Sequence, residues 1–256
     1  MILVADIGNT TITVGVYNGE KLLACWRLAS DKKRSEDEYG VLLLNFLKHA
    51  QLHGKLTGAA ISSVVLPLTE RLKVAIEKYL DVETLVVNHK TKLGMEIAID
   101  APEEAGPDRI VNAFAASKLY PQPVIVVDFG TATTFDIVDD NKFIGGMITA
   151  GIKIQADALS NFTSRLPNVK IEAPKNTIGK NTIDAMLSGL VRGHSCMIDG
   201  MVEACEKELG KKATVVATGG YSPIISDNLN RPFDVINPEL TLEGLRMIWE
   251  KCNIQK

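Results

Sequence analysis

The sequence predicts an α/β protein built from two similar lobes. The first observation is an internal repeat, since a β-rich run at residues 2–16 recurs at residues 124–138. The second is that helical patterns, separated by single strand patterns, follow each run. The repeat offset is 122 residues (128 − 6), the separation of Asp6 from Asp128. An offset this long indicates two lobes, because solenoid repeats are much shorter.

Each copy of the repeat is expected to form a strand, a tight turn of small residues and a second strand. The same offset aligns four further pairs, namely Val4 with Val126, Gly8 with Gly130, Thr11 with Thr133 and Val16 with Val138. Turn-forming residues follow both copies, at 18–19 and 139–141, and predict a further hairpin in each lobe.

The remaining elements follow from the spacing of apolar residues. Periodicity near 3.6 predicts helices at residues 35–53, 70–80, 109–119, 154–163, 182–209 and 240–250. Short β-rich runs predict strands at residues 58–64, 84–87 and 213–217. The stretch Pro121-Gln122-Pro123 is the expected boundary between lobes. We therefore expect an N-terminal lobe of residues 1–120 and a C-terminal lobe of residues 121–256.

Composition narrows the function classes. The 256 residues are 46% hydrophobic, which is enough for a sizeable core. A net charge of −3 argues against nucleic acid or an anionic membrane as a partner. The four cysteines form no CxxC pair, and the N-terminal run reads as a strand rather than a signal peptide. No apolar run reaches the ~18 residues of a membrane helix, so we expect a cytoplasmic protein.

The repeated turns have the chemistry of a phosphate clamp. Glycine at Gly8 and Gly130 lets backbone N–H groups approach an anion closely. Hydroxyl and amide groups at residues 9, 10, 11 and 13 can donate to phosphate oxygens without adding charge. Asp6 and Asp128 fit beside phosphate only if a cation lies between them. One such turn alone could be a structural hairpin, whereas two indicate a site for a nucleoside triphosphate and its metal.

A third glycine turn supports a nucleotide site. The run Val215-Val-Ala-Thr-Gly-Gly220 predicts a buried strand that ends in two glycines before a helix. Such a strand end lets an adenosine approach the backbone in α/β proteins. On its own, this pattern is also typical of an ordinary strand-to-helix turn.

Together these motifs resemble the actin-like ATPase superfamily, which includes the sugar kinases. Within it, the chain resembles the type III pantothenate kinases from residue 3 to about residue 248. The motifs that carry this resemblance lie at residues 106–113, 128–134, 145–146, 178–182 and 240–245.

The resemblance implies a fold and a reaction. The fold is two ribonuclease-H-like lobes with mixed sheets and a nucleotide cleft between them. The reaction transfers the γ-phosphoryl group of ATP to the primary hydroxyl of pantothenate, in the first step of coenzyme A biosynthesis. It implies ATP, Mg²⁺ and a monovalent cation (K⁺ or NH₄⁺) as cofactors, and a homodimer as the assembly.

The resemblance also assigns residues. Asp108 is the implied general base, although an N-cap of the following helix is the alternative role. Arg109 would hold the substrate carboxylate or an ATP oxygen. Asp6 would bind magnesium and Asp128 the monovalent cation. The implied ATP contacts are Asp6, Ile7, Gly8, Asn9, Thr10, Thr11, Ile12, Thr13, Gly130, Thr131 and Gly219, and the implied pantothenate contacts are Ile99, Gly106, Pro107, Asp108, Arg109 and Thr182.

Four departures from the family pattern bear on the acceptor. Ile99 stands where the family has a tyrosine before its catalytic aspartate, and Ala150 replaces a proline. The acidic run at residues 35–38 is only partly kept, and a Tyr-Gly-Tyr pattern reads Arg192-Gly193-His194. Three alternatives therefore stay open: a kinase for another hydroxyl compound, a non-catalytic nucleotide-sensing protein and an actin-like filament former.

Overall fold

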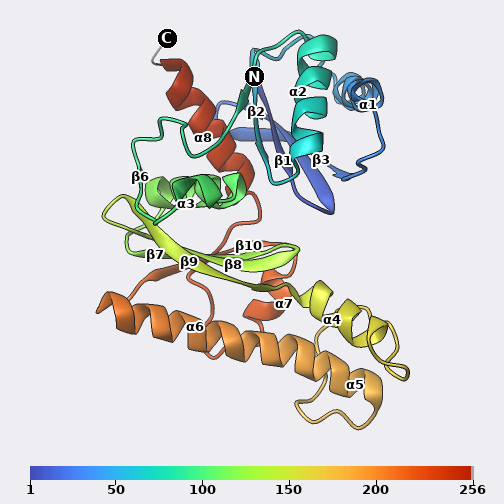
Figure 1. Ribbon diagram of the computed structural model, residues 1–256, viewed down its shortest axis with the longest axis vertical. Coiled ribbons are helices and arrows are strands. Elements are labelled where there is room, and N and C mark those ends of the chain that lie inside the picture. The colour runs from blue at the N-terminus through green and yellow to red at the C-terminus, as the bar shows by residue number, and fades with distance from the viewer. Residues whose placement is uncertain (255–256) are drawn as a thin grey trace. The chain divides into compact units, whose positions relative to one another are not determined.

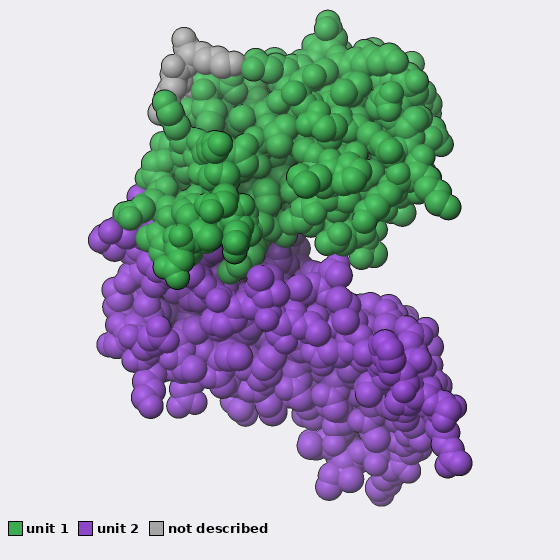
Figure 2. All heavy atoms as spheres, in the orientation of Figure 1, with its two compact units in different colours: residues 1–118, 239–256 green, residues 119–238 purple. Residues whose placement is uncertain are grey.

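The computed structural model describes residues 1–254 and divides the chain into two compact units (Figures 1 and 2). Unit 1 contains residues 1–118 together with the C-terminal segment that begins at residue 239. Unit 2 contains residues 119–238. The expected division after residue 120 lies close to the observed one. The C-terminal segment differs, because it groups with the N-terminal unit rather than with residues 121–238.

Unit 1 contains a mixed five-stranded sheet in the order β3-β2-β1-β4-β5. Its strands are β1 (Ile2–Ile7), β2 (Thr11–Asn18), β3 (Lys21–Ala29), β4 (Gly58–Ser63) and β5 (Thr84–Val86). The first three pair antiparallel, and β4 and β5 continue the sheet in parallel from β1. Antiparallel pairing follows from the short turns between β1, β2 and β3, while the parallel strands are reached through helices.

The helices of unit 1 are α1 (Glu36–His49), α2 (Leu66–Leu80), α3 (Pro107–Leu119) and α8 (Leu240–Ile254). The short strand β6 (Glu96–Ile97) and the 3₁₀ turn η1 (Pro102–Glu104) precede α3. A capping box begins α1: the Ser35 hydroxyl accepts from the Glu38 amide, and the Glu38 carboxylate accepts from the Ser35 amide. The helix ends before residue 53, because Gln51 has a φ of 59°.

The two faces of this sheet bury different helices. Helices α1 and α2 lie side by side (Figure 1), and with alternate residues of β1, such as Leu3 and Ala5, they form one core cluster. Helix α8 packs against β1 and β4. Its Trp249 ring lies so near Gly58 that a Cβ there would approach it to 2.6 Å. This close packing explains why the C-terminal helix belongs to unit 1.

Unit 2 repeats the strand arrangement of unit 1. Its strands are β7 (Val124–Phe129), β8 (Ala132–Asp139), β9 (Lys142–Ala150), β10 (Thr214–Gly219) and β11 (Val235–Ile236). They lie in the order β9-β8-β7-β10-β11, which matches β3-β2-β1-β4-β5. The pairing senses also match, with β7, β8 and β9 antiparallel and β10 and β11 parallel to β7. The internal repeat therefore corresponds to a repeated sheet.

The register corrects one detail of the sequence alignment. In unit 1, Ile7 pairs with Ile12, whereas in unit 2 Phe129 pairs with Thr133. The second turn is one residue shorter, so after the turn the equivalent residues are 121 apart and not 122. Thr11 therefore corresponds to Ala132 rather than to Thr133.

The helices of unit 2 are α4 (Ile152–Asn161), α5 (Thr182–Leu187), α6 (Gly193–Leu209) and α7 (Ser222–Ser226). A π-helical segment η2 (Ser188–Arg192) joins α5 to α6, so the single helix expected at residues 182–209 contains an irregular turn. Apolar residues of α6, such as Ile198 and Val202, pack against Val215 of β10 in the core of this unit.

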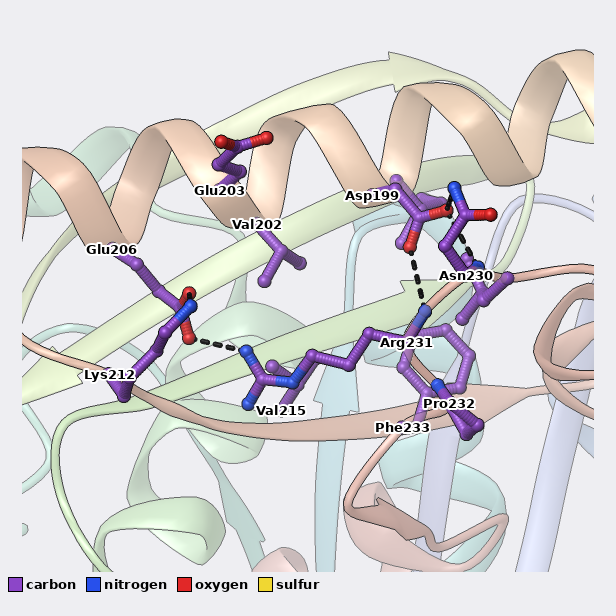
Figure 3. Close-up of a pocket in the computed structure, with 12 residues that line it drawn as sticks. Asp199, Val202, Glu203, Glu206, Lys212, Val215, Asn230, Arg231, Pro232 and Phe233 are labelled. Carbon is purple, nitrogen blue, oxygen red and sulfur yellow. Dashed lines mark hydrogen bonds and ion pairs between the residues drawn. The ribbon is translucent and has the colours of Figure 1, made fainter.

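A network of charged groups ties α6 to the start of β10 (Figure 3). Glu206 of α6 has a side chain that is only 6% exposed. Its carboxylate accepts from Arg231 and Lys212, each at 2.6 Å, and from the Ala213 amide at 3.1 Å. Burial alone would raise the pKa of Glu206, but these three donors outweigh it and lower the pKa to about 2.

Glu206→Gln is expected to lower the free energy of unfolding by about 2 kcal/mol at pH 7, because it removes charge-assisted hydrogen bonds. The folded-state pKa lies below the ordinary value of 4.5, so this contribution is complete above that pH. It is lost as the pH falls toward 2. Urea unfolding at pH 7 and pH 3 measures the difference between the two proteins.

The matched control is Glu208→Gln, which changes an exposed glutamate two residues further along the same helix. It should leave the free energy of unfolding within about 0.5 kcal/mol of wild type. Equal losses in both variants would show that the Glu206 network contributes nothing particular to stability.

Candidate active site

The first predicted phosphate turn lies at the C-terminal end of β1. Asp6 is opposite Ser62 of the parallel strand β4, and the Ser62 hydroxyl donates to the Asp6 carboxylate. The Gly8 amide closes the turn by donating to the Thr11 carbonyl at 3.0 Å. Ser30, just after β3, donates its hydroxyl to the Gly8 carbonyl at 2.6 Å. The turn is therefore held from three strands of one sheet.

The side chains of this turn separate into two sets. Ile7 and Ile12 are fully buried in the core, so only their backbone groups are available to a ligand. Asp6 and Thr13 form a cross-strand pair, and both are half-buried on the opposite face. Asn9 and Thr10 are exposed at the tip. Strand alternation thus separates residues that anchor the turn from residues that can contact a nucleotide.

Asp108 lies at the same end of the unit 1 sheet. A Cβ on Gly106 would lie 2.5 Å from the Asp108 carboxylate and 3.7 Å from Val64, the residue that follows β4. The Val64 amide in turn donates to the Ile7 carbonyl at 3.1 Å. Glycine at position 106 therefore allows the start of α3 to fold closely around Asp108, beside the Asp6 turn.

Asp108 is not the N-cap of α3. The helix begins at Pro107, and the Gly106 carbonyl accepts the Ile110 amide at 3.1 Å, so Gly106 occupies the position before the helix. The Asp108 carboxylate accepts from the Arg109 amide at 2.8 Å. Burial raises the pKa of Asp108, and the Arg109 amide and guanidinium oppose this only in part. The carboxylate is therefore more basic than an exposed aspartate.

The second predicted phosphate turn lies at the equivalent edge of the unit 2 sheet. Asp128 is the penultimate residue of β7, and Gly130 and Thr131 form the exposed tip. The Gly151 amide donates to the Thr131 carbonyl at 3.2 Å. Gly219 lies opposite Phe129 at the end of the neighbouring strand β10. Asp128, the turn and the glycine of the third motif therefore lie at one edge of this sheet.

Glycine is required at the end of β10 for a physical reason. Gly219 has a φ of +87°, and a Cβ there would lie 2.6 Å from the Phe129 carbonyl oxygen. The end of strand β10 therefore passes very close to the second turn. An adenosine or phosphate group could approach this backbone without meeting a side chain.

Two predicted substrate residues belong to other segments of the chain. Thr182 is the exposed first residue of α5, where Asn181 caps the helix. Ile99 is a half-buried residue between β6 and η1. Sequence reasoning missed Ser62 and Ser30, which hold the first turn. The pair Ser62-Ser63 at the end of an otherwise apolar strand was the signal for one of them.

A pocket of about 270 Å³ in unit 2 contains none of the predicted site residues (Figure 3). It lies between α6 and residues 229–233. Three of its charged groups, Asp199, Glu206 and Arg231, bind one another or nearby backbone amides. The predicted site residues therefore lie outside this pocket.

The residues at the two turns suit a nucleotide and its metal. Gly8, Gly130 and Gly219 leave backbone accessible to phosphate, and the Asp6 carboxylate and Ser62 hydroxyl are the oxygen ligands that Mg²⁺ prefers. Within residues 1–254, no three His, Cys, Asp or Glu side chains cluster as a metal site. Asp6 would therefore hold Mg²⁺ together with hydroxyl or phosphate oxygens. In the same part of the chain, no helix is both long and apolar enough to cross a membrane.

Solved structures with the same fold include ATP-dependent kinases. The ROK family glucokinase from Streptomyces griseus, in complex with glucose and AMPPNP, aligns with a TM-score of 0.51 at 14% identity and covers 97% of this chain and 99% of its own. The ethanolamine utilization protein EutJ from Carboxydothermus hydrogenoformans aligns with a TM-score of 0.56 at 16% identity, over 96% and 89%. These similarities confirm the predicted two-lobed, actin-like fold.

Curated relatives are much closer in sequence. A type III pantothenate kinase from Dehalococcoides mccartyi is 44% identical over 97% of each chain. One from Bacillus cytotoxicus is 42% identical over 98% of this chain and 96% of its own. The family model for type III pantothenate kinases matches residues 2–204. The chain therefore belongs to the type III pantothenate kinase family.

Proposed function

We propose that this kinase transfers the γ-phosphoryl group of ATP to the primary hydroxyl of pantothenate, with Asp108 as the general base. The product is 4′-phosphopantothenate, in the first step of coenzyme A biosynthesis. The observation that supports this most is the position of Asp108 beside the Asp6 turn, in a setting that raises its pKa. Phosphoryl transfer needs a proton acceptor near the attacking hydroxyl and donors around the phosphates.

Asp108 has the properties of a proton acceptor for this reaction. Its carboxylate is half-buried, so water competes weakly for it, and its raised pKa increases its affinity for the hydroxyl proton. The Arg109 amide fixes one carboxylate oxygen at 2.8 Å. The Arg109 guanidinium would pair with the carboxylate of pantothenate or with a phosphate oxygen.

The two turns would bind the phosphates of ATP, which supplies the transferred phosphoryl group. Hydroxyl and amide groups at residues 9, 10, 11 and 13, together with the exposed turn at Gly130 and Thr131, are suited to phosphate oxygens. Gly219 would leave room for the adenosine. Asp6 would hold Mg²⁺, and Asp128 would hold K⁺ or NH₄⁺, since each carboxylate needs a cation to lie near phosphate.

Pantothenate would contact Gly106, Pro107, Asp108 and Arg109, with Ile99 and Thr182 completing the pocket. We also propose a homodimer that acts in the cytoplasm. Three exposed apolar side chains of unit 2 support a covering partner, because Phe162 is 89%, Ile178 82% and Ile183 50% exposed. A second copy of the chain on this surface would remove them from water.

Asp108→Asn is expected to reduce pantothenate-dependent ADP release by about 10²-fold or more, because the amide cannot accept the proton. Nucleotide binding should remain near wild type, since the phosphate donors are unchanged. A coupled ADP assay and calorimetric titration with ADP measure the two properties. Glu104→Gln, an exposed change in the turn before α3, is the control and should keep full activity.

Full turnover by Asp108→Asn would remove Asp108 from the mechanism. Wild-type protein that binds ATP but releases no ADP with pantothenate would instead show that another compound is the acceptor. A panel of small hydroxyl compounds in the same assay distinguishes these outcomes, and Ile99 is the residue to examine first in that case.

The same substitution is expected to stabilise the fold. Because the folded-state pKa of Asp108 is raised, its ionisation opposes folding, and stability is lost as the pH rises through that pKa. Asparagine keeps the acceptor for the Arg109 amide but carries no charge. Thermal unfolding should show a Tm about 2 °C or more above wild type at pH 7 and a smaller difference at pH 4. A lower Tm at pH 7 would contradict the proposed burial cost.

Asp128→Asn is expected to abolish the activation of ADP release by K⁺, since it removes the proposed ligand charge. Rates measured as K⁺ replaces Na⁺ at constant ionic strength test this. Asp140→Asn, at an exposed hairpin tip of the same unit, should respond to K⁺ as wild type does. Equal rates in K⁺ and Na⁺ for the wild-type protein would contradict the monovalent site.

A further inference from the structure

Two buried polar side chains, Thr133 and His194, and the partly exposed Gln155 form a hydrogen-bonded group next to the second phosphate turn. Thr133 is 1% exposed and His194 is 3% exposed. The Nε2 atom of His194 lies 3.0 Å from the Thr133 hydroxyl oxygen, and its Nδ1 atom lies 3.1 Å from Nε2 of Gln155. The Gln155 amide also donates to the Ala150 carbonyl at 2.8 Å. The three side chains thus form one hydrogen-bonded chain.

The direction of each hydrogen bond follows from the chemistry of the groups. If the Gln155 amide were turned around, its oxygen would face the Ala150 carbonyl, and two acceptors would meet. Gln155 therefore presents its NH₂ group to His194, and Nδ1 must accept. The proton of a neutral imidazole then lies on Nε2, which donates to Thr133. Burial lowers the pKa of His194, which favours this neutral form.

This hydrogen-bonded group connects segments next to the turn. Thr133 is the second residue of β8 and pairs with Phe129 across the three residues 130–132. Ala150 is the last residue of β9, and the next residue, Gly151, donates its amide to Thr131. Gln155 lies in the first turns of α4. His194 therefore links β8, on one flank of the turn, to the end of β9 through side-chain hydrogen bonds.

The π-helical segment η2 ends immediately before the residues that present His194. A π turn shifts the phase of the helix that follows, and such turns occur often at functional sites. His194 is the second residue of α6, and the Phe129 ring packs against its imidazole with centroids 6.1 Å apart. An unbroken α-helix would place position 194 at a different angle around the helix axis. The irregular turn thus directs this histidine toward the phosphate turn.

We propose that His194 is a positioning residue that fixes the second phosphate turn for ATP through Thr133 and Gln155. The inference rests on the proposed function, in that this turn contacts the phosphates. A turn that is held in place before binding gives tighter binding than one that must be ordered by the ligand.

The test compares three variants by the affinity for ADP, the KM values for ATP and pantothenate, and the Tm. Thr133→Val keeps the shape of the side chain and removes its acceptor, and His194→Phe removes both ring nitrogens. Each should raise the Kd for ADP and the KM for ATP about tenfold and leave the KM for pantothenate unchanged. The double variant should have the same Kd for ADP and KM for ATP as either single variant, because both substitutions break the same series of hydrogen bonds.

His194→Gln is the conservative variant. Its amide can donate to Thr133 and accept from Gln155, so it should recover most of the nucleotide affinity. Ser195→Ala is the matched control for stability. It removes a buried hydroxyl of the same helix, which donates to the Val191 carbonyl at 2.9 Å. It should lower the Tm and leave the KM for ATP unchanged.

Nucleotide affinities that follow Tm alone in all five variants, or additive losses in the double variant, would overturn the positioning role. Thr133→Val keeps the test decisive if His194→Phe does not fold. Wild-type protein that binds no nucleotide would overturn the proposed function and this role with it. If the wild-type protein phosphorylates pantothenate and the variants keep unchanged KM values, the role of His194 is overturned and the proposed function stands.

Discussion

The structure depends on a hairpin whose first strand also pairs with a parallel neighbour. In unit 1, β1 lies between β2 and β4, and in unit 2, β7 lies between β8 and β10. The central strand therefore has both edges hydrogen-bonded, and its C-terminal end is held rigidly. An aspartate at that end, Asp6 or Asp128, is fixed beside a tight turn of small residues. This constraint positions a carboxylate and backbone donors together without a dedicated binding loop.

Much of this arrangement could be predicted because the repeat can be recognised in short stretches of sequence. Alternating apolar residues and Asp-x-Gly turns predicted both hairpins and the two-lobed α/β class. The shorter second turn could not be predicted, because residue identities align equally well before strand pairing is known. The grouping of α8 with unit 1 was also missed. It depends on Trp249 meeting Gly58, a contact between residues distant in the sequence.

The residues of the candidate site also divide into those that the sequence predicted and those that it did not. The residues of the turns and Asp108 were predicted from motifs, since their spacing is short and regular. The supporting residues Ser62, Gln155 and His194 come from separate elements, and only folding brings each beside its turn. The π turn before His194 has no signal in apolar periodicity, because one extra residue per turn barely changes the pattern. Sequence thus identifies the groups proposed to contact the ligand better than the groups that support them.

Asp108 and Glu206 show how a carboxylate proposed to act on the ligand differs in energy from one that supports the fold. Both are carboxylates largely removed from water, but Glu206 receives three donors and its pKa falls to about 2. Asp108 receives backbone donors from Arg109 and from its own amide, with partial compensation by the Arg109 charge, but burial outweighs them and its pKa rises. Further donors around Asp108 would stabilise the fold and weaken the base, because each would hold the charged form. The shortage of hydrogen-bond donors to the Asp108 carboxylate therefore lowers the stability of the fold. The same shortage raises the proton affinity of the carboxylate, which suits it to act as a base.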